Sequence, residues 1–229
     1  MKNLITGDSH TEAIQFNNSS LLLCSAGSAK GLNNPNSISQ YNKLIINNIN
    51  NNNYNILVFS FGSVDVDFSF IHKLIDNPSI DYIEFNKIVI DNYLEFIVNN
   101  FRDRNIIILS ISLPTLADEY LKYGLLNGHI NYLENYNIDI LKNKLDNMIL
   151  PNILERTNIS MNFNEQLKNK VISLNLNNIK YLDVTSFTYD DQLKRIKDIF
   201  FTKNDHHNWY RMHFYGEIIN KFIETNFLV

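Results

Sequence analysis

The sequence is poor in the residues that mark linkers and disulfide frameworks. Its 229 residues include one cysteine, four prolines and seven glycines. The single cysteine, Cys24, excludes an internal disulfide framework and favours a reducing compartment. Because proline and glycine are scarce and scattered, no stretch has the composition of an interdomain linker. We therefore expect one domain comprising residues 1–229.

Long apolar runs and a charge excess of one sign are also missing. No run approaches the ~18 apolar residues of a membrane-spanning helix, and residues 1–7 contain no signal-peptide core. Lys and Arg total 20 and Asp and Glu total 24, spread along the chain. We therefore expect no membrane or nucleic-acid partner and a cytoplasmic location. A hydrophobic share of 45% is too high for a disordered chain.

Asparagine, by contrast, is abundant, with 38 residues in the chain. It occurs in expected helices, loops and turns alike, and isoleucine, lysine and tyrosine are abundant with it. All four amino acids have AT-rich codons, so a skewed coding composition explains the excess more simply than a function does.

Short apolar segments alternate with helical patterns along the chain. The segments expected to form strands are residues 2–6, 20–25, 55–61, 105–112 and 179–184. The helical patterns cover residues 39–48, 80–101, 138–150, 164–174 and 209–225. Short, continuously apolar strands are typical of a parallel sheet covered on both faces. The order predicts an α/β fold, a three-layer α/β/α sandwich with a five-stranded parallel sheet, with residues 116–136 as an irregular excursion.

Ligands of such sheets bind at the carboxyl ends of the strands, so the residues after each strand are the candidates for a site. The first strand is followed by Gly7-Asp8-Ser9-His10 and the third by Gly62-Ser63-Val64-Asp65. A late cluster, Asp205-His206-His207, precedes the last helical pattern. A serine hydroxyl becomes a useful nucleophile when a base takes its proton and a third group orients that base. The alternative is a purely structural role, in which Gly-Asp-Ser caps the N-terminus of a helix.

These three segments, in this order, resemble the sequence blocks of the SGNH/GDSL hydrolase superfamily. The resemblance covers nearly the whole chain and implies ester hydrolysis by Ser9, with a late histidine as base and an aspartate that orients it. In that family the aspartate and the histidine are three positions apart, which here places Asn208 at the histidine position. We therefore assign His207 as the base and Asp205 as its partner, with His206 as the alternative base.

The same resemblance implies an oxyanion hole. Its first donor would be the Ser9 amide and its second the amide of Gly27, with Gly31 as the alternative. The family's third donor is an asparagine side chain, and here that position is Val64, which donates nothing. A Gly-x-Val-Asp version of this block resembles a subgroup found near glycan-synthesis enzymes, and Ser63 or Lys30 could replace the missing donor. The remaining residues expected to line the site are Asp8, His10, Gly62, Ser63 and Asp65.

The predicted function is therefore hydrolysis of an O-acyl ester on a carbohydrate or another small molecule, without a cofactor or a metal. Three alternatives stay open. One is O-acyl transfer to a sugar on the same fold, and another is a degenerate site that only binds a glycan or a protein. The weakest is a metal-dependent phosphoesterase. It is considered because Asp205-His206-His207 also matches the signature of the DHH phosphoesterases, and Asp65 and Asp67 could add carboxylate ligands.

Overall fold

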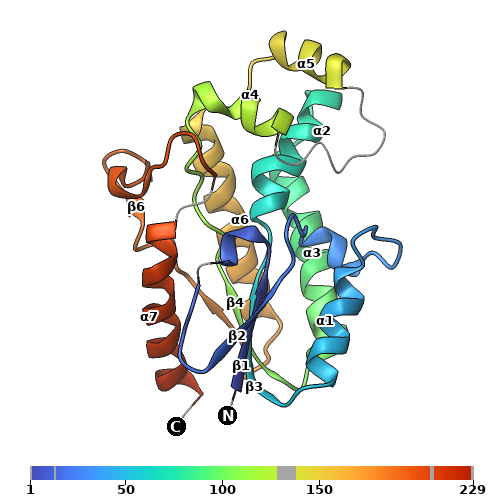
Figure 1. Ribbon diagram of the computed structural model, residues 1–229, viewed down its shortest axis with the longest axis vertical. Helices are drawn as coiled ribbons and strands as arrows, with labels where there is room; N and C mark the ends of the chain where they lie inside the picture. Colours follow the sequence, from blue (N-terminus) through green and yellow to red (C-terminus); the bar gives the residue numbers. More distant parts are fainter. Residues whose placement is uncertain (1, 13, 128–137, 207–208, 228–229) are drawn as a thin grey trace.

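A computed structural model of the chain confirms the predicted five-stranded parallel sheet (Figure 1). It describes residues 2–12, 14–127, 138–206 and 209–227, with the side chains of 127 and 209–213 excepted. The strand order is β2-β1-β3-β4-β5, and all neighbouring pairs run parallel. The strands are β1 (Lys2–Gly7), β2 (Ser19–Leu23), β3 (Tyr54–Ser60), β4 (Asn105–Leu109) and β5 (Ile179–Leu182). No strand end differs from its predicted position by more than three residues.

The two faces of the sheet are covered by different helices, which gives the three layers (Figure 1). Helix α7 (Trp209–Asn226) packs on one face, and α1 (Tyr41–Asn50), α3 (Tyr82–Phe101) and α6 (Ile153–Ser173) pack on the other. Successive strand residues point to opposite faces. Along β3, Val58 therefore faces α7, whereas Leu57 and Phe59 face the other helices.

Helix α6 begins eleven residues before the predicted start at residue 164, so that prediction is wrong at its N-terminal end. The helix starts with a capping box, in which Asn152 accepts hydrogen bonds from the helix backbone and Glu155 accepts one from the Asn152 amide. Buried residues then recur every four positions, at Ile159, Phe163, Leu167 and Val171. The spacing Asn-x-x-Glu before this stripe is a signal that predicts the true start.

The segment 116–136 is not irregular throughout, because α4 (Asp118–Asn127) lies within it. Leu121 and Leu125, four positions apart, are buried and give this helix its apolar side. Residues 128–137 lie outside the described part. Helix α5 (Ile138–Asp146) ends four residues before the predicted boundary.

Smaller elements that the apolar pattern did not indicate complete the fold. A π-helical turn, η3 (Asp65–Ser69), continues directly into α2 (Phe70–Asp76) after the third strand. Turns of 3₁₀ helix lie at Ser9–Thr11, Lys30–Asn33 and Asp198–Phe200, and β6 (Tyr189–Asp190) pairs antiparallel with β7 (Arg195–Ile196). Among the described helices, none is both long and apolar enough to cross a membrane.

Helix α7 comes very close to the chain segment that follows the first candidate block. A Cβ atom on Gly216 would lie 1.8 Å from the carbonyl oxygen of Gln15. Only glycine permits this approach, which holds the middle of α7 against the segment between Ser9 and β2.

Candidate active site

The first block, residues 7–11, is anchored to both neighbouring strands at the carboxyl end of β1. The carbonyl of Gly7 accepts a hydrogen bond from Cys24 N on the β2 side, and Asp8 N donates to Ser60 O on the β3 side. The chain then forms the 3₁₀ turn that starts at Ser9. Ser9 is half-buried and lies at the carboxyl edge of the sheet, after the strand between β2 and β3.

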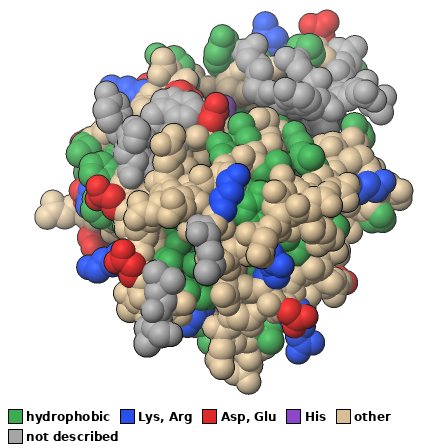
Figure 2. All heavy atoms as spheres, turned by 60° about the horizontal axis from the view of Figure 1, so that its bottom comes forward, with side chains coloured by type: hydrophobic (Ala, Val, Ile, Leu, Met, Phe, Trp, Pro, Cys, Tyr) green, Lys and Arg blue, Asp and Glu red, His purple; other side chains and the backbone are tan. Residues whose placement is uncertain are grey.

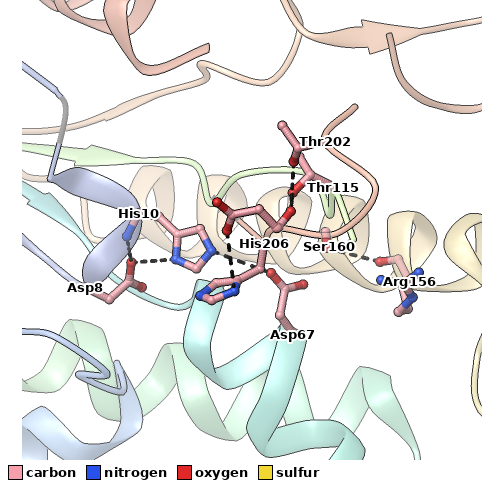
Figure 3. Close-up of polar contacts among 9 residues, drawn as sticks. Asp8, His10, Asp67, Thr115, Arg156, Ser160, Thr202 and His206 are labelled. Carbon is pink, nitrogen blue, oxygen red and sulfur yellow. Dashed lines mark hydrogen bonds and ion pairs between the residues drawn. The ribbon is translucent and has the colours of Figure 1, made fainter. Parts of the chain in front are cut away.

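Asp8 and His10 form a buried pair that flanks Ser9 (Figure 3). One carboxylate oxygen of Asp8, Oδ1, lies 3.0 Å from the His10 amide nitrogen and 3.0 Å from Nδ1 of its ring. The second ring nitrogen, Nε2, lies 3.9 Å from Oδ2 of Asp67. Asp8 and His10 are only 1% and 3% exposed, and burial makes such a charge-assisted contact strong. His10 therefore holds a fixed orientation between two carboxylates.

We expect His10→Ala to destabilise the fold and His10→Asn to recover most of the loss. Alanine leaves the buried Asp8 carboxylate without its ring partner, which costs about 1–3 kcal/mol. The shorter asparagine side chain carries an amide donor near the position of Nδ1 but does not reach Asp67. Urea unfolding of the two variants and the wild type measures the difference. Equal destabilisation by alanine and asparagine would show that the contact between Asp8 and Nδ1 is unimportant.

The loop after β2, residues 27–31, is held in place by Asp65 of η3. The Asp65 carboxylate accepts hydrogen bonds from the amides of Ala29 at 2.6 Å and Lys30 at 3.4 Å. Asp65 is fully buried, and burial raises the pKa of its carboxyl to about 6, although hydrogen bonds from Ala29, Ser28 and Lys30 pull it down. Asp65 thus couples two loops that are distant in sequence, which is a structural task and not a contact with a reacting group.

Gly27, the predicted second oxyanion donor, has its amide engaged. Gly27 N donates to the carbonyl of Cys24 at 2.7 Å, in a tight turn whose residue Ala26 has a φ of 57°. The next amide, that of Ser28, donates to no acceptor among the residues that the structure describes, and neither does the amide of Ser9. The arrangement therefore offers Ser9 and Ser28 as available backbone donors, whereas Gly27 would have to leave its turn. The prediction for Gly27 stays untested.

The third block, residues 62–65, turns sharply from β3 into a helix. Gly62 has a φ of 121°, and a Cβ atom on it would lie 2.7 Å from the ring of Phe163. Both the backbone conformation and the space therefore require glycine. Ser63 and Val64 are buried at 4% exposure. The helix continues through the π-helical turn η3, an irregularity that is frequent at functional sites.

The late loop is tied to the loop after β4. The carbonyl of Asp205 accepts hydrogen bonds at 2.8 Å from the hydroxyls of both Thr115 and Thr202 (Figure 3). Ala117 N donates to Lys203 O at 2.6 Å, which extends the connection. These contacts bring the late Asp-His cluster to the same edge of the sheet as the first block.

The ring of His206 lies against His10 of the first block and against Phe68 of η3, the helical turn after β3. Its centroid is 5.5 Å from that of His10 and 5.1 Å from that of Phe68, in edge-on geometry. Its Nδ1 lies 3.9 Å from Oδ1 of Asp205. Figure 3 shows the rings of His10 and His206 next to each other, with the side chain of Asp67 beside them. His207, the preferred base, lies outside the described residues.

The structure adds Phe68, Thr115 and Arg156, which the sequence analysis did not name, to the site. His206 lines a small cavity together with Asp67, Phe68, Thr115 and Arg156. Its volume of about 10 Å³ leaves room for roughly one water molecule. Arg156 of α6 is buried and donates to Leu116 O and to Asp118, both at 2.7 Å, so it holds the loop after β4. A lone arginine within a helix gives no sequence signal for this role, because its partners come from another element.

The hydroxyl of Ser9 makes no hydrogen bond to any residue in the described ranges, His206 included. The structure thus brings Ser9, His10, Asp67 and His206 to one edge of the sheet, without a formed contact between Ser9 and His206. Apo active sites often tighten only around a substrate. Whether Ser9, Asp205 and His207 act together stays a prediction.

The structure also bears on two other kinds of chemistry, reaction at the Cys24 thiol and binding of a metal ion. Cys24 is buried, and burial raises the pKa of its thiol to about 11, so it stays protonated and unreactive at neutral pH. Within the described part of the chain, no three His, Cys, Asp or Glu side chains are arranged to hold a metal ion. Asp65 is committed to the amides of Ala29 and Lys30. The described residues therefore give the phosphoesterase alternative no support.

The sequence matches no protein-family model, and no curated protein is similar enough in sequence to match it. Its fold has counterparts among solved structures. One is a GDSL-like lipase from Bacteroides thetaiotaomicron, with 11% identity and a TM-score of 0.53 over 98% of this chain and 88% of that chain. Another is a Bacteroides fragilis protein assigned as an acylhydrolase, with 11% identity and a TM-score of 0.55 over 98% and 86%. At this identity the likeness shows a shared fold across nearly the whole length, and this fold agrees with the α/β/α sandwich that the order of strands and helices predicted.

Proposed function

We propose that this protein hydrolyses small O-acyl esters through Ser9. One observation carries the proposal: the first block and the late cluster lie together at the carboxyl end of the sheet. The ring centroids of His10 and His206 are 5.5 Å apart there. Ser9 as the proposed nucleophile and His206 as a candidate base come from opposite ends of the chain, and both lie at the edge where α/β sheets bind ligands, which supports the proposal. The fold shared with an acylhydrolase and a GDSL-like lipase supports the same chemistry.

In the proposed reaction, the Ser9 Oγ attacks the carbonyl carbon of the ester while His207 takes its proton. Asp205 orients the imidazole and stabilises its charged form. The tetrahedral intermediate collapses, the bond to the alcohol oxygen breaks, and the histidine returns the proton to that oxygen. A water molecule, activated by the same histidine, then hydrolyses the acyl-serine. His206 is the alternative base.

The oxyanion requires donors that are oriented before the reaction. The Ser9 amide is the first donor. The second is Gly27 if its turn opens, or the neighbouring Ser28 amide, which makes no hydrogen bond within the described residues. Val64 is buried and offers no side-chain donor, and loss of one such donor typically costs about 10²–10³ in rate. We therefore propose a slow esterase.

The alcohol portion is a carbohydrate or another small molecule, and transfer of the acyl group to a sugar is the close variant. Product analysis with and without an added sugar acceptor separates the two reactions, since transfer yields an acylated sugar in place of the free acid.

Labelling with a fluorophosphonate tests the nucleophile directly. We expect one probe molecule to attach to Ser9, since only a serine beside a base reacts readily with this electrophile. Intact mass and peptide mapping locate the adduct. Labelling of another serine, or none after prolonged exposure of folded protein, would refute Ser9 as the nucleophile.

A second candidate function is a binding module with a degenerate site. It is favoured by the Ser9 hydroxyl, which has no hydrogen-bond partner among the described residues, and by valine in place of the family's asparagine. Such a module would bind an ester or a glycan at the same edge of the sheet without Ser9-dependent turnover.

A further inference from the structure

A hollow of about 600 Å³ lies at the opposite end of the sheet from Ser9, at the amino ends of the strands. Its walls come from the starts of β1, β3 and β4, from the turn before β2, and from one face of α7. The volume falls within the range of small-molecule binding sites. Seven residues of β3 separate this end from the Ser9 end, which is about 20 Å along the strand.

Asparagine side chains form the rim. Six of the ten residues that line the hollow are asparagines, a far higher share than the 38 in 229 of the whole chain. The six are Asn3, Asn17, Asn18, Asn55, Asn105 and Asn220. Coding composition spreads asparagine over the surface, but it does not gather the residue around one concavity.

The fold uses few of these amide groups. Asn3 Nδ2 donates to the carbonyl of Asn17 at 3.1 Å, and Asn220 Oδ1 accepts from the amide of Asn17 at 2.8 Å, which fixes one wall. The side chains of Asn18, Asn55 and Asn105 make no hydrogen bond to any residue that the structure describes. Each such amide offers two donor hydrogens and an acceptor oxygen.

The floor is apolar and the charge is low. Ile56 and Ile223 are buried beneath the rim, and Phe227 adds a half-buried ring. Asn220, Ile223 and Glu224 recur at helical spacing, so α7 presents them on one face, and Phe227 follows directly after the end of the helix. Glu224 is the one charged residue among the described residues that line the hollow. Much of the face that Figure 2 turns forward is uncharged polar side chain and backbone, with scattered charges.

We infer that this hollow binds an uncharged carbohydrate. Sugar hydroxyls both donate and accept hydrogen bonds, as the asparagine amides do, and the C–H face of a pyranose ring can pack on the apolar floor. A phosphate or another anion would find no lysine, arginine or histidine among the described lining residues, and a metal ion would find one carboxylate. The site is separate from the proposed esterase centre and does not depend on its activity.

Titration of the ¹⁵N-labelled full chain with xylohexaose, maltohexaose and chitohexaose tests the inference. We expect at least one of them to shift the side-chain amide signals of Asn55 and Asn105, with a Kd on the order of 1 mM. The double variant Asn55→Ala/Asn105→Ala should bind at least about tenfold more weakly. Both side chains are exposed, so the variant should fold, and its melting temperature checks this.

The matched control is Asn158→Ala/Asn169→Ala, which removes two exposed asparagines of α6 that lie outside the hollow. It should bind like the wild type, and so should Ser9→Ala. The inference is overturned if no neutral hexasaccharide shifts these signals, if only a sulfated heparin hexasaccharide does, or if the control weakens binding as much. Loss of binding in Ser9→Ala would instead place the saccharide at the other end of the sheet.

Discussion

Replacing Ser9 with alanine is expected to lower kcat/KM for a short-chain p-nitrophenyl ester by at least ~10³-fold. Without the hydroxyl no acyl-enzyme can form, and the residual rate comes from binding and oxyanion donors alone. The Ser9 side chain contacts no other described residue through a hydrogen bond, so its removal should leave the melting temperature nearly unchanged. Initial rates and thermal unfolding of the same preparations test both halves of the prediction.

Ser173→Ala is the matched control, because the hydroxyl of this exposed serine at the end of α6 bonds, among the described residues, only to the carbonyl of Lys170. It should retain wild-type activity. His207→Ala should lower the rate as much as Ser9→Ala if His207 is the base, whereas a larger effect of His206→Ala would identify the alternative. Hydrolysis that persists in Ser9→Ala at the wild-type rate would refute the proposed mechanism and assign the activity to another group.

The second large effect is expected for Asp65→Ala, which should reduce both stability and activity. The substitution leaves the amides of Ala29 and Lys30 without their buried acceptor, at about 1–3 kcal/mol each. The loop 27–31 that supplies the predicted oxyanion donors then loses its tie to η3. We expect an unfolding free energy lower by about 2–4 kcal/mol, measured in urea, together with a lower kcat. Wild-type values for both would show that this tie is dispensable.

The titration of Asp65 also makes the stability of the fold depend on pH, and the direction of the change follows from its pKa. Burial raises the pKa of its carboxyl to about 6, whereas an unfolded chain titrates near 4. The folded protein therefore binds this proton more tightly, and the contribution of Asp65 to stability is largest below about pH 4. It falls as the pH rises from about 4 to 6 and is then level, a loss of about 3 kcal/mol.

Asp65→Asn, which carries no titrating proton, should lack this fall. The difference between wild-type and variant unfolding free energies, measured from pH 4 to 7, isolates it. Asp103→Asn at an exposed position controls for the removal of one carboxyl group. A wild-type curve that rises relative to Asp65→Asn across this window would contradict the assigned sign.

Much of the candidate site followed from short stretches of sequence. A strand that ends in Gly-Asp-Ser, and another that ends in a glycine before a polar turn, identify the edge of the sheet and its candidate nucleophile. The capping pattern at Asn152 and Glu155 would also have given the true start of α6. The residues that make up each such signal lie close together in the chain, so local hydrogen bonds and apolar periodicity determine the structure they form.

The sequence by itself determined the five-stranded parallel sheet, its covering helices and the blocks at its carboxyl end, because each depends on apolar periodicity and on residues close together in the chain. Only the tertiary structure decided that Asp8 holds His10 against His206, that the Gly27 amide is already bonded, and that Asp65 holds the loop before it. It alone gathered six asparagines around one hollow at the far end of the sheet. The contacts of His10 with His206 and of Asp65 with Ala29, like the gathering of the asparagines, join residues separated by tens to hundreds of positions, and no local pattern of the chain specifies which of them meet.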